Sequence, residues 1–83
     1  MQSDKGFDIY PNPATDYFVV YNYNVSVQQI MLYDVSGRLI KNIRNSDLAT
    51  RIDVGNLNNG VYVLSIKNGD GKNLRTEKIV IAR

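Results

Sequence analysis

The stretch Leu57-Asn58-Asn59-Gly60-Val61-Tyr62-Val63-Leu64-Ser65-Ile66 is the part of the chain around which we expect the rest to fold. Its second half, Val61 to Ile66, is almost wholly apolar and rich in β-branched residues, which predicts a buried strand. Its first half predicts a sharp turn, because Asn59 and Gly60 both tolerate positive φ.

The spacing from Leu57 through Gly60 to Tyr62 favours a tyrosine corner. In this arrangement the ring enters the core while the hydroxyl bonds to the backbone a few residues upstream. The alternative is an ordinary strand tyrosine that follows an ordinary turn. The corner is our prediction, because it satisfies the polar end of a buried Tyr62.

Short runs rich in Val, Ile and Tyr alternate with turn-forming clusters along the whole chain, and no segment shows a helical period. Strands at this spacing are typical of an antiparallel sandwich. We therefore predict an all-β fold, a seven-stranded antiparallel immunoglobulin-like β-sandwich. The predicted strands are Phe7–Tyr10, Tyr17–Tyr21, Val27–Asp34, Arg38–Ile43, Thr50–Val54, Val61–Lys67 and Arg75–Ile81.

Apolar residues recur at every second position in several strands, which assigns one face of each to the core. In the second strand we expect Phe18 and Val20 to face the core. In the other strands the pattern groups Ile30 with Leu32, Ile52 with Val54, and Ile79 with Ile81, each pair on one face. In the fourth strand, Leu39 and Ile43 are expected on the face opposite to Ile40.

Two segments between strands have specific turn chemistry. Pro11-Asn12-Pro13 ends the first strand, because proline donates no backbone hydrogen bond, and it predicts a rigid bend between the sheets. In Asp34-Val35-Ser36-Gly37-Arg38 we expect a hairpin, with Asp34 accepting from turn amides and Gly37 left-handed. Arg38 is placed to pair with Asp34.

The composition describes one small domain without covalent reinforcement. Eighty-three residues, 43% of them hydrophobic, support a single modest core, and the chain has no cysteine. We expect residues 1–6 to be the remnant of a linker and residues 7–83 to be the domain.

Enzymatic chemistry is not indicated. The chain has no histidine, so no serine has its usual activating base, and its carboxylates occur singly. The segment Asn68–Asn73 resembles a calcium loop, but Lys72 stands where an oxygen ligand is required, so we interpret it as a hairpin turn. We therefore predict no catalytic residue, no metal and no cofactor.

Charge and hydropathy give further expectations about partners. The net charge is +2, and residues 67–83 hold five basic and two acidic residues. Tyr10, Tyr21, Tyr23 and Tyr33 could offer rings to bases, but the basic residues concentrate elsewhere in the sequence, so we predict no nucleic-acid partner. No apolar run approaches the roughly 18 residues of a membrane helix, so we predict no membrane insertion.

Four motifs follow one another along the chain: Tyr10-Pro11-Asn12-Pro13-Ala14, Tyr33-Asp34-Val35-Ser36-Gly37-Arg38, Leu57-x-x-Gly60-x-Tyr62 and Lys78-Ile79-Val80-Ile81. Together they resemble the type A C-terminal sorting domain of the type IX secretion system of Bacteroidetes. The resemblance covers residues 7–83. The family often has a second lysine beside Lys78, and here that position is Glu77.

The resemblance implies a non-catalytic signal that leads an N-terminally fused, folded cargo from the periplasm to the outer-membrane surface or the medium. It implies as partners the outer-membrane translocon and a sortase-type peptidase, which cuts the preceding linker. By this resemblance the recognised residues are Gly60, Tyr62, Lys78, Ile79, Val80 and Ile81. Pro11, Asn12, Pro13, Asp34, Gly37, Arg38 and Leu57 are structural motif residues.

The physical route of recognition is a separate hypothesis. We expect Arg75–Ile81 to be an edge strand with open backbone groups and flanking positive charge, which favours docking by strand addition or through its basic face. Exposed edges also make a strand-exchanged dimer an expectation. The alternative function is an immunoglobulin-like adhesive or carbohydrate-binding accessory module, with Tyr17, Tyr21 and Tyr33 as its ligand face.

Overall fold

The computed structural model describes residues 6–23, 27–44 and 48–83, without the side chains of residues 27 and 28. Of the expected linker remnant, residues 1–6, only Gly6 falls within these ranges. No helix occurs in the described parts of the chain, and so none there is long enough to cross a bilayer.

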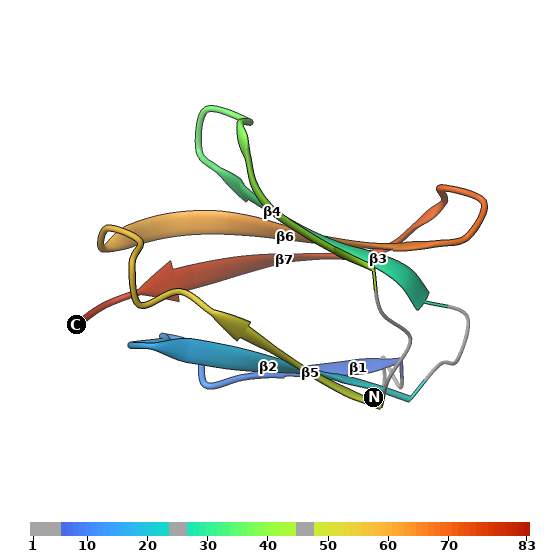
Figure 1. Ribbon diagram of the computed structural model, residues 1–83, viewed down its shortest axis with the longest axis horizontal. Coiled ribbons are helices and arrows are strands. Elements are labelled where there is room, and N and C mark those ends of the chain that lie inside the picture. The colour runs from blue at the N-terminus through green and yellow to red at the C-terminus, as the bar shows by residue number, and fades with distance from the viewer. Residues whose placement is uncertain (1–5, 24–26, 45–47) are drawn as a thin grey trace.

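Seven strands form two antiparallel sheets that pack face to face (Figure 1). The strands are β1 (Phe7–Tyr10), β2 (Tyr17–Asn22), β3 (Val27–Asp34), β4 (Leu39–Arg44), β5 (Ala49–Asp53), β6 (Gly60–Asn68) and β7 (Asn73–Ile81). One sheet has the order β1-β2-β5 and the other β4-β3-β6-β7. The predicted all-β sandwich is confirmed, with strand ends that differ from the prediction by at most two residues.

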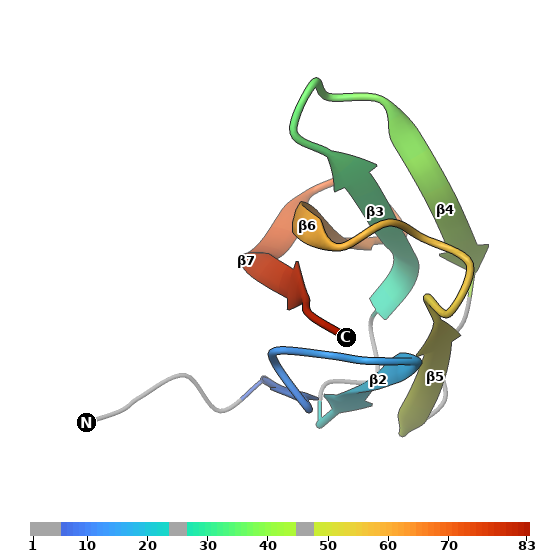
Figure 2. The same ribbon diagram turned by 90° about the vertical axis from the view of Figure 1, so that its left-hand side faces the viewer.

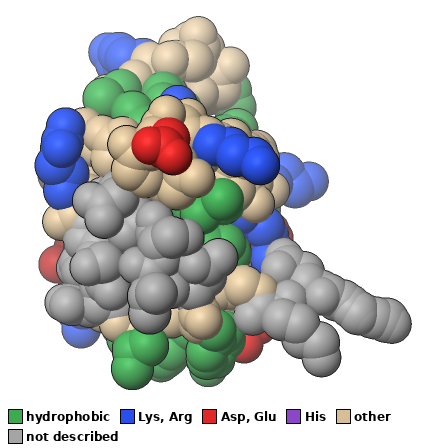
Figure 3. All heavy atoms as spheres, turned by 90° about the vertical axis from the view of Figure 1, so that its right-hand side faces the viewer, with side chains coloured by type: hydrophobic (Ala, Val, Ile, Leu, Met, Phe, Trp, Pro, Cys, Tyr) green, Lys and Arg blue, Asp and Glu red, His purple; other side chains and the backbone are tan. Residues whose placement is uncertain are grey.

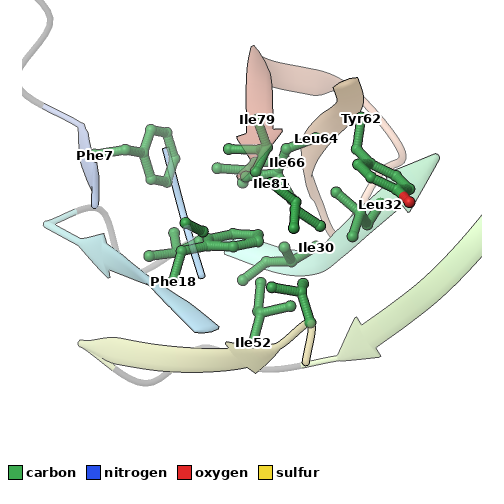
Figure 4. Packing of buried hydrophobic residues seen from close by; sticks show 13 residues of the cluster. Phe7, Phe18, Ile30, Leu32, Ile52, Tyr62, Leu64, Ile66, Ile79 and Ile81 are labelled. Carbon is green, nitrogen blue, oxygen red and sulfur yellow. The ribbon is translucent and has the colours of Figure 1, made fainter. Parts of the chain in front are cut away.

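The core lies between the two sheets, where side chains from both point toward one another (Figure 4). Phe18 and Val20 are buried, as predicted, and the pairs expected to share a face are buried together: Ile30 with Leu32, Ile52 with Val54, and Ile79 with Ile81. Phe7, Ala14, Tyr62, Leu64 and Ile66 complete the cluster. The period of two was therefore sufficient to group the residues that share a face, and the packing of the two sheets decides which face is buried.

The prediction for β4 is wrong. Ile40 and Ile43 both pack against the core, whereas Leu39 is exposed. The register between β3 and β4 shifts between Leu32 and Tyr33 and leaves Ile40 as an extra residue. A bulge of this kind breaks the period of two, so residues at odd and even positions reach the same face.

The two hairpins of the larger sheet are built in the same way. In the first, Asp34 Oδ1 accepts from the backbone N–H groups of Ser36 and Arg38, at 2.9 and 3.0 Å, and Gly37 has φ +89°. In the second, Asn68 Oδ1 accepts two backbone N–H groups, each at 3.0 Å. The two bonds to Asp34 Oδ1 confirm the predicted hairpin at Asp34–Arg38.

The Asn68–Lys72 turn uses its own side-chain oxygen in the same way. Asn68 Oδ1 receives the amides of Asp70 and Lys72, and the Gly71 amide donates to the Asn68 carbonyl. The first potential ligand of a calcium loop is thus committed to the turn. Among the described residues there is no cluster of acidic side chains that would hold a metal ion.

The Asp34 turn predicts a pH-dependent stability. Hydrogen bonds from Ser36 and from the Arg38 amide lower the pKa of Asp34 below its usual value of 3.8, and the positive charge of Arg38 lowers it further. A lowered folded-state pKa stabilises the fold above the unfolded pKa, and this contribution is lost as the pH falls through the folded pKa. We expect Asp34→Asn to lower the melting temperature at pH 7, with a difference from wild type that shrinks below about pH 4.

The matched control for this measurement is Asn68→Ala, which removes the equivalent acceptor of the second turn without removing a charge. Its melting-temperature difference from wild type should not vary over the same pH range. A constant difference for Asp34→Asn down to pH 2 would contradict the electrostatic role of Asp34.

Candidate functional site

The motifs Leu57–Tyr62 and Lys78–Ile81 pair with each other across β6 and β7. Gly60 faces Ile81, Tyr62 faces Ile79, and between them Val61 faces Val80. The next pair is Val63 with Lys78. The residues expected to be recognised therefore come together in one patch of the sheet, although 18 residues of chain separate Gly60 from Lys78.

The tyrosine corner at this patch is confirmed. The Tyr62 hydroxyl donates to the Asn58 carbonyl over 2.8 Å, and the residue is 8% exposed. Gly60 has φ +153°, and a Cβ added there would meet no atom within 4 Å. Glycine is thus required at this position by the backbone conformation and not by lack of space.

The motif Tyr33–Arg38 lies beside the corner. Asp34 is the register partner of Tyr62, and Tyr33 is the partner of Val63. The hairpin that follows Asp34 therefore projects from the same end of the larger sheet as Gly60 (Figure 1). We call this end of the sandwich the motif end.

The motif Tyr10–Ala14 reaches the motif end from the other sheet, and it hydrogen-bonds to the outer edge of β7. The Asn12 Nδ2 donates to the Lys78 carbonyl over 2.8 Å, and the Val80 amide donates to Asn12 Oδ1 over 3.0 Å. The Ala14 amide donates to the Val80 carbonyl over 2.7 Å, and the Ala82 amide donates to the Ala14 carbonyl over 2.9 Å. Figure 2 shows the β1–β2 connection passing beneath the end of β7. We call this contact the clasp, residues 12–14.

The clasp corrects two predictions. The Pro11–Pro13 bend does not cross between sheets, since β1 and β2 pair within one sheet; it binds the other sheet instead. Strand β7 is an edge strand, as predicted, but its backbone is not open between Lys78 and Ala82. The two prolines cannot donate, so the Asn12 side-chain amide supplies both a donor and an acceptor where a strand backbone would.

Sequence reasoning missed the role of Arg83. Its Nη2 donates to the Val54 carbonyl over 2.6 Å, and its Nη1 donates to Asn59 Oδ1 over 3.2 Å. The backbone amide of Arg83 also donates to Asn59 Oδ1, over 3.3 Å. The residues after β7 are thereby bound to the turn that precedes β6. No local pattern indicates a contact between residues 24 or more positions apart.

The expected recognition residues separate into a buried and a surface group. Ile79, Ile81 and Tyr62 belong to the core. Gly60 and Lys78 are exposed and Val80 is partly exposed. Buried side chains cannot touch a partner while the domain stays folded, so the first group acts by holding the second in place.

Lys78 and Glu77 point to opposite faces of β7, as neighbours in a strand do. Arg75 is bound to Glu77 by two hydrogen bonds, of 3.1 and 2.9 Å. Lys78 forms no ion pair within the described parts of the chain. The charge of Lys78 is therefore free for an external partner, and Glu77 does not neutralise it from the same face.

The tyrosines of the alternative ligand face do not all lie together. Tyr17 and Tyr21 lie on β2, in the three-stranded sheet, but Tyr33 lies on β3, in the other sheet. The predicted face of Tyr17, Tyr21 and Tyr33 is therefore wrong as a single surface. β2 ends at Asn22 and β3 begins at Val27 in the other sheet, so the tyrosines of these two strands do not share a face.

Comparison with known proteins gives two matches. A family model described as "Secretion system C-terminal sorting domain" matches residues 8–82. The chain is 29% identical over 73 residues to the ulvan lyase NLR42 of Nonlabens ulvanivorans. That alignment covers 87% of this chain and 14% of the lyase.

The corner bond predicts a measurable loss of stability. Tyr62→Phe keeps the buried ring but leaves the Asn58 carbonyl without its donor, and should lower the free energy of unfolding by about 1 kcal/mol. Urea denaturation measures this. Tyr33→Phe is the control, since its hydroxyl donates a weak hydrogen bond to the Met31 sulfur over 3.6 Å, and equal losses in both variants would contradict the corner.

The clasp predicts a change that is local to β7. Asn12→Ala removes two hydrogen bonds and should lower the free energy of unfolding by about 1–2 kcal/mol. It should also speed hydrogen exchange at the Val80 amide, which loses its acceptor. Asn42→Ala, an exposed asparagine of β4, is the control, and unchanged exchange at Val80 in Asn12→Ala would show that the clasp does not protect the edge.

Proposed function

The chain belongs to the family of type IX secretion system C-terminal sorting domains, and from this membership we propose that the motif end is the part that the export machinery reads. The domain is the non-catalytic sorting part of a secreted cargo protein, and such cargo reaches the cell surface or the medium. Within the ulvan lyase, the matching region is likewise a small part of the whole.

In this proposal the domain passes through the periplasm already folded and leads its cargo through the outer-membrane translocon. The observation that supports it most directly is the convergence of four motifs, spread over residues 10–81, on one end of the sandwich. Such an assembly exists only after folding, so a receptor that requires it selects folded domains.

The surface offered to the receptor is the outer face of β6 and β7 at the motif end. Lys78 is exposed, Val61 is 41% exposed and Val80 is partly exposed, and Val61 and Val80 are direct register partners. A cation beside an apolar pair favours a receptor with an acidic group next to an apolar surface. Strand addition along Lys78–Ala82 would first require release of the clasp, so docking through this face is the simpler route.

A sortase-type peptidase removes the domain in this proposal. A peptidase needs a segment of backbone that is not already paired, and from Phe7 onward β1 is paired with β2, so in this proposal the cut lies before Phe7. The start of β1 and the C-terminal end of β7 lie at opposite ends of the sandwich (Figure 1). A receptor bound at the motif end therefore leaves the cargo linker accessible to the peptidase.

Export of a fused reporter tests the proposal. Lys78→Glu reverses the free charge and should reduce the amount of exported reporter by about tenfold, which corresponds to about 1.4 kcal/mol of docking energy. Lys67→Glu is the matched control, since Lys67, on β6, lies on the same face of the sheet as Lys78 but at the end far from the motif end. Its export should stay normal.

Thermal unfolding of both variants separates recognition from stability. Lys78 is exposed, so its variant should melt within a few degrees of wild type. Normal export of Lys78→Glu, or equal loss in both variants, would refute docking through this face.

A further inference from the structure

The outer face of the three-stranded sheet carries most of the tyrosines of the protein. Six tyrosines occur in the chain, of which Tyr62 lies in the core and Tyr33 on the other sheet. The alternation of β1 and β2 places Tyr10, Tyr17 and Tyr21 on the solvent side of this sheet. Tyr23 follows β2 and joins them there through its hydrogen bond to Asp8. We call this surface the tyrosine face.

The rings of the tyrosine face are accessible and mutually ordered. Tyr10 and Tyr21 stack with ring centroids 5.1 Å apart and an interplanar angle of 26°. Tyr10 is 53%, Tyr17 37% and Tyr23 59% exposed. Strand propensity alone does not explain this clustering, because the equivalent face of β6 and β7 carries valines at positions 61, 63 and 80.

Polar groups at fixed positions accompany the rings. The Tyr23 hydroxyl donates to Asp8 Oδ2 over 3.1 Å. The Arg51 guanidinium lies 4.1 Å from the centre of the Tyr17 ring, and its Nε donates to Asp53 Oδ1 over 2.8 Å. The surface thus combines aromatic rings with carboxylate oxygens and phenol groups, which both bond hydroxyls.

The charge of the tyrosine face limits what it can bind. The register places Asp8, Arg51 and Asp53 on it, and Arg51 is paired with Asp53. Lysine is absent from β1, β2 and β5. In the view of Figure 3, most Lys and Arg side chains lie over the upper, four-stranded sheet, and apolar side chains gather along the lower margin. The carboxylate of Asp8 would repel a polyanion at this face, whereas it would not repel a neutral ligand.

We propose that the tyrosine face binds a neutral polysaccharide chain. Sugar rings present C–H groups that pack on aromatic rings, and their hydroxyls bond carboxylates and phenols at the edge. The face lies on the opposite side of the sandwich from Lys78 and Val80, so a bound glycan leaves the proposed docking surface free. This inference does not depend on the proposed export function.

Titration of the 83-residue domain with cellohexaose and mannohexaose, as neutral probes, tests the inference. The protein has no tryptophan, so its tyrosine fluorescence reports directly on the rings. We expect saturable binding of at least one neutral probe, with Kd of about 0.1–1 mM for a shallow site. Hexagalacturonate, the acidic probe, should not bind.

Two variants and one control assign the binding to this face. Tyr10→Ala and Tyr23→Ala should each weaken binding about tenfold, while Tyr33→Ala, on the other sheet, should leave it unchanged. Thermal unfolding identifies any variant that has lost its fold. If one of Tyr10→Ala and Tyr23→Ala is unfolded, the binding test relies on the other. Binding of neither neutral probe, tighter binding of hexagalacturonate, or unchanged binding in Tyr10→Ala and Tyr23→Ala would each overturn the proposal.

Discussion

The hydrogen bonds between the clasp and β7 are the constraint on which the rest of this domain depends. A sandwich of this size has a small core, and an open edge strand invites pairing with other chains. Asn12 and Ala14 cover the C-terminal half of the β7 edge and at the same time join the two sheets. The same four bonds therefore close this edge and add to the core packing that holds the two sheets together.

The clasp also changes the interpretation of the family motifs. Tyr62, Ile79 and Ile81 are buried, and Asn12 is used in holding β7, so these four residues build the motif end. Loss of export after a change at such a position would first report on folding. Lys78 is different, because its charge is exposed and unpaired within the described residues. A change at Lys78 can therefore test the proposed recognition with little effect on stability.

The two outer faces of the sandwich have different chemistry. The face of β6 and β7 presents valines with Lys78, whereas that of β1, β2 and β5 presents tyrosines with carboxylates. Because each face belongs to a different sheet, ligands on them would not compete. The two proposed binding surfaces are therefore compatible with each other in one small domain.

The sequence alone specified the features that depend on neighbouring residues. The residues that share a face of each regular strand follow from a period of two, and the hairpin at Asp34 and the corner at Tyr62 follow from turn chemistry within a few residues. The clasp, the contacts of Arg83, the extra residue Ile40 in β4 and the grouping of the tyrosines emerged only from the folded chain. Each of these depends on which strands pair and on what covers a sheet edge, and those choices are made between residues far apart in sequence, where local patterns carry no information.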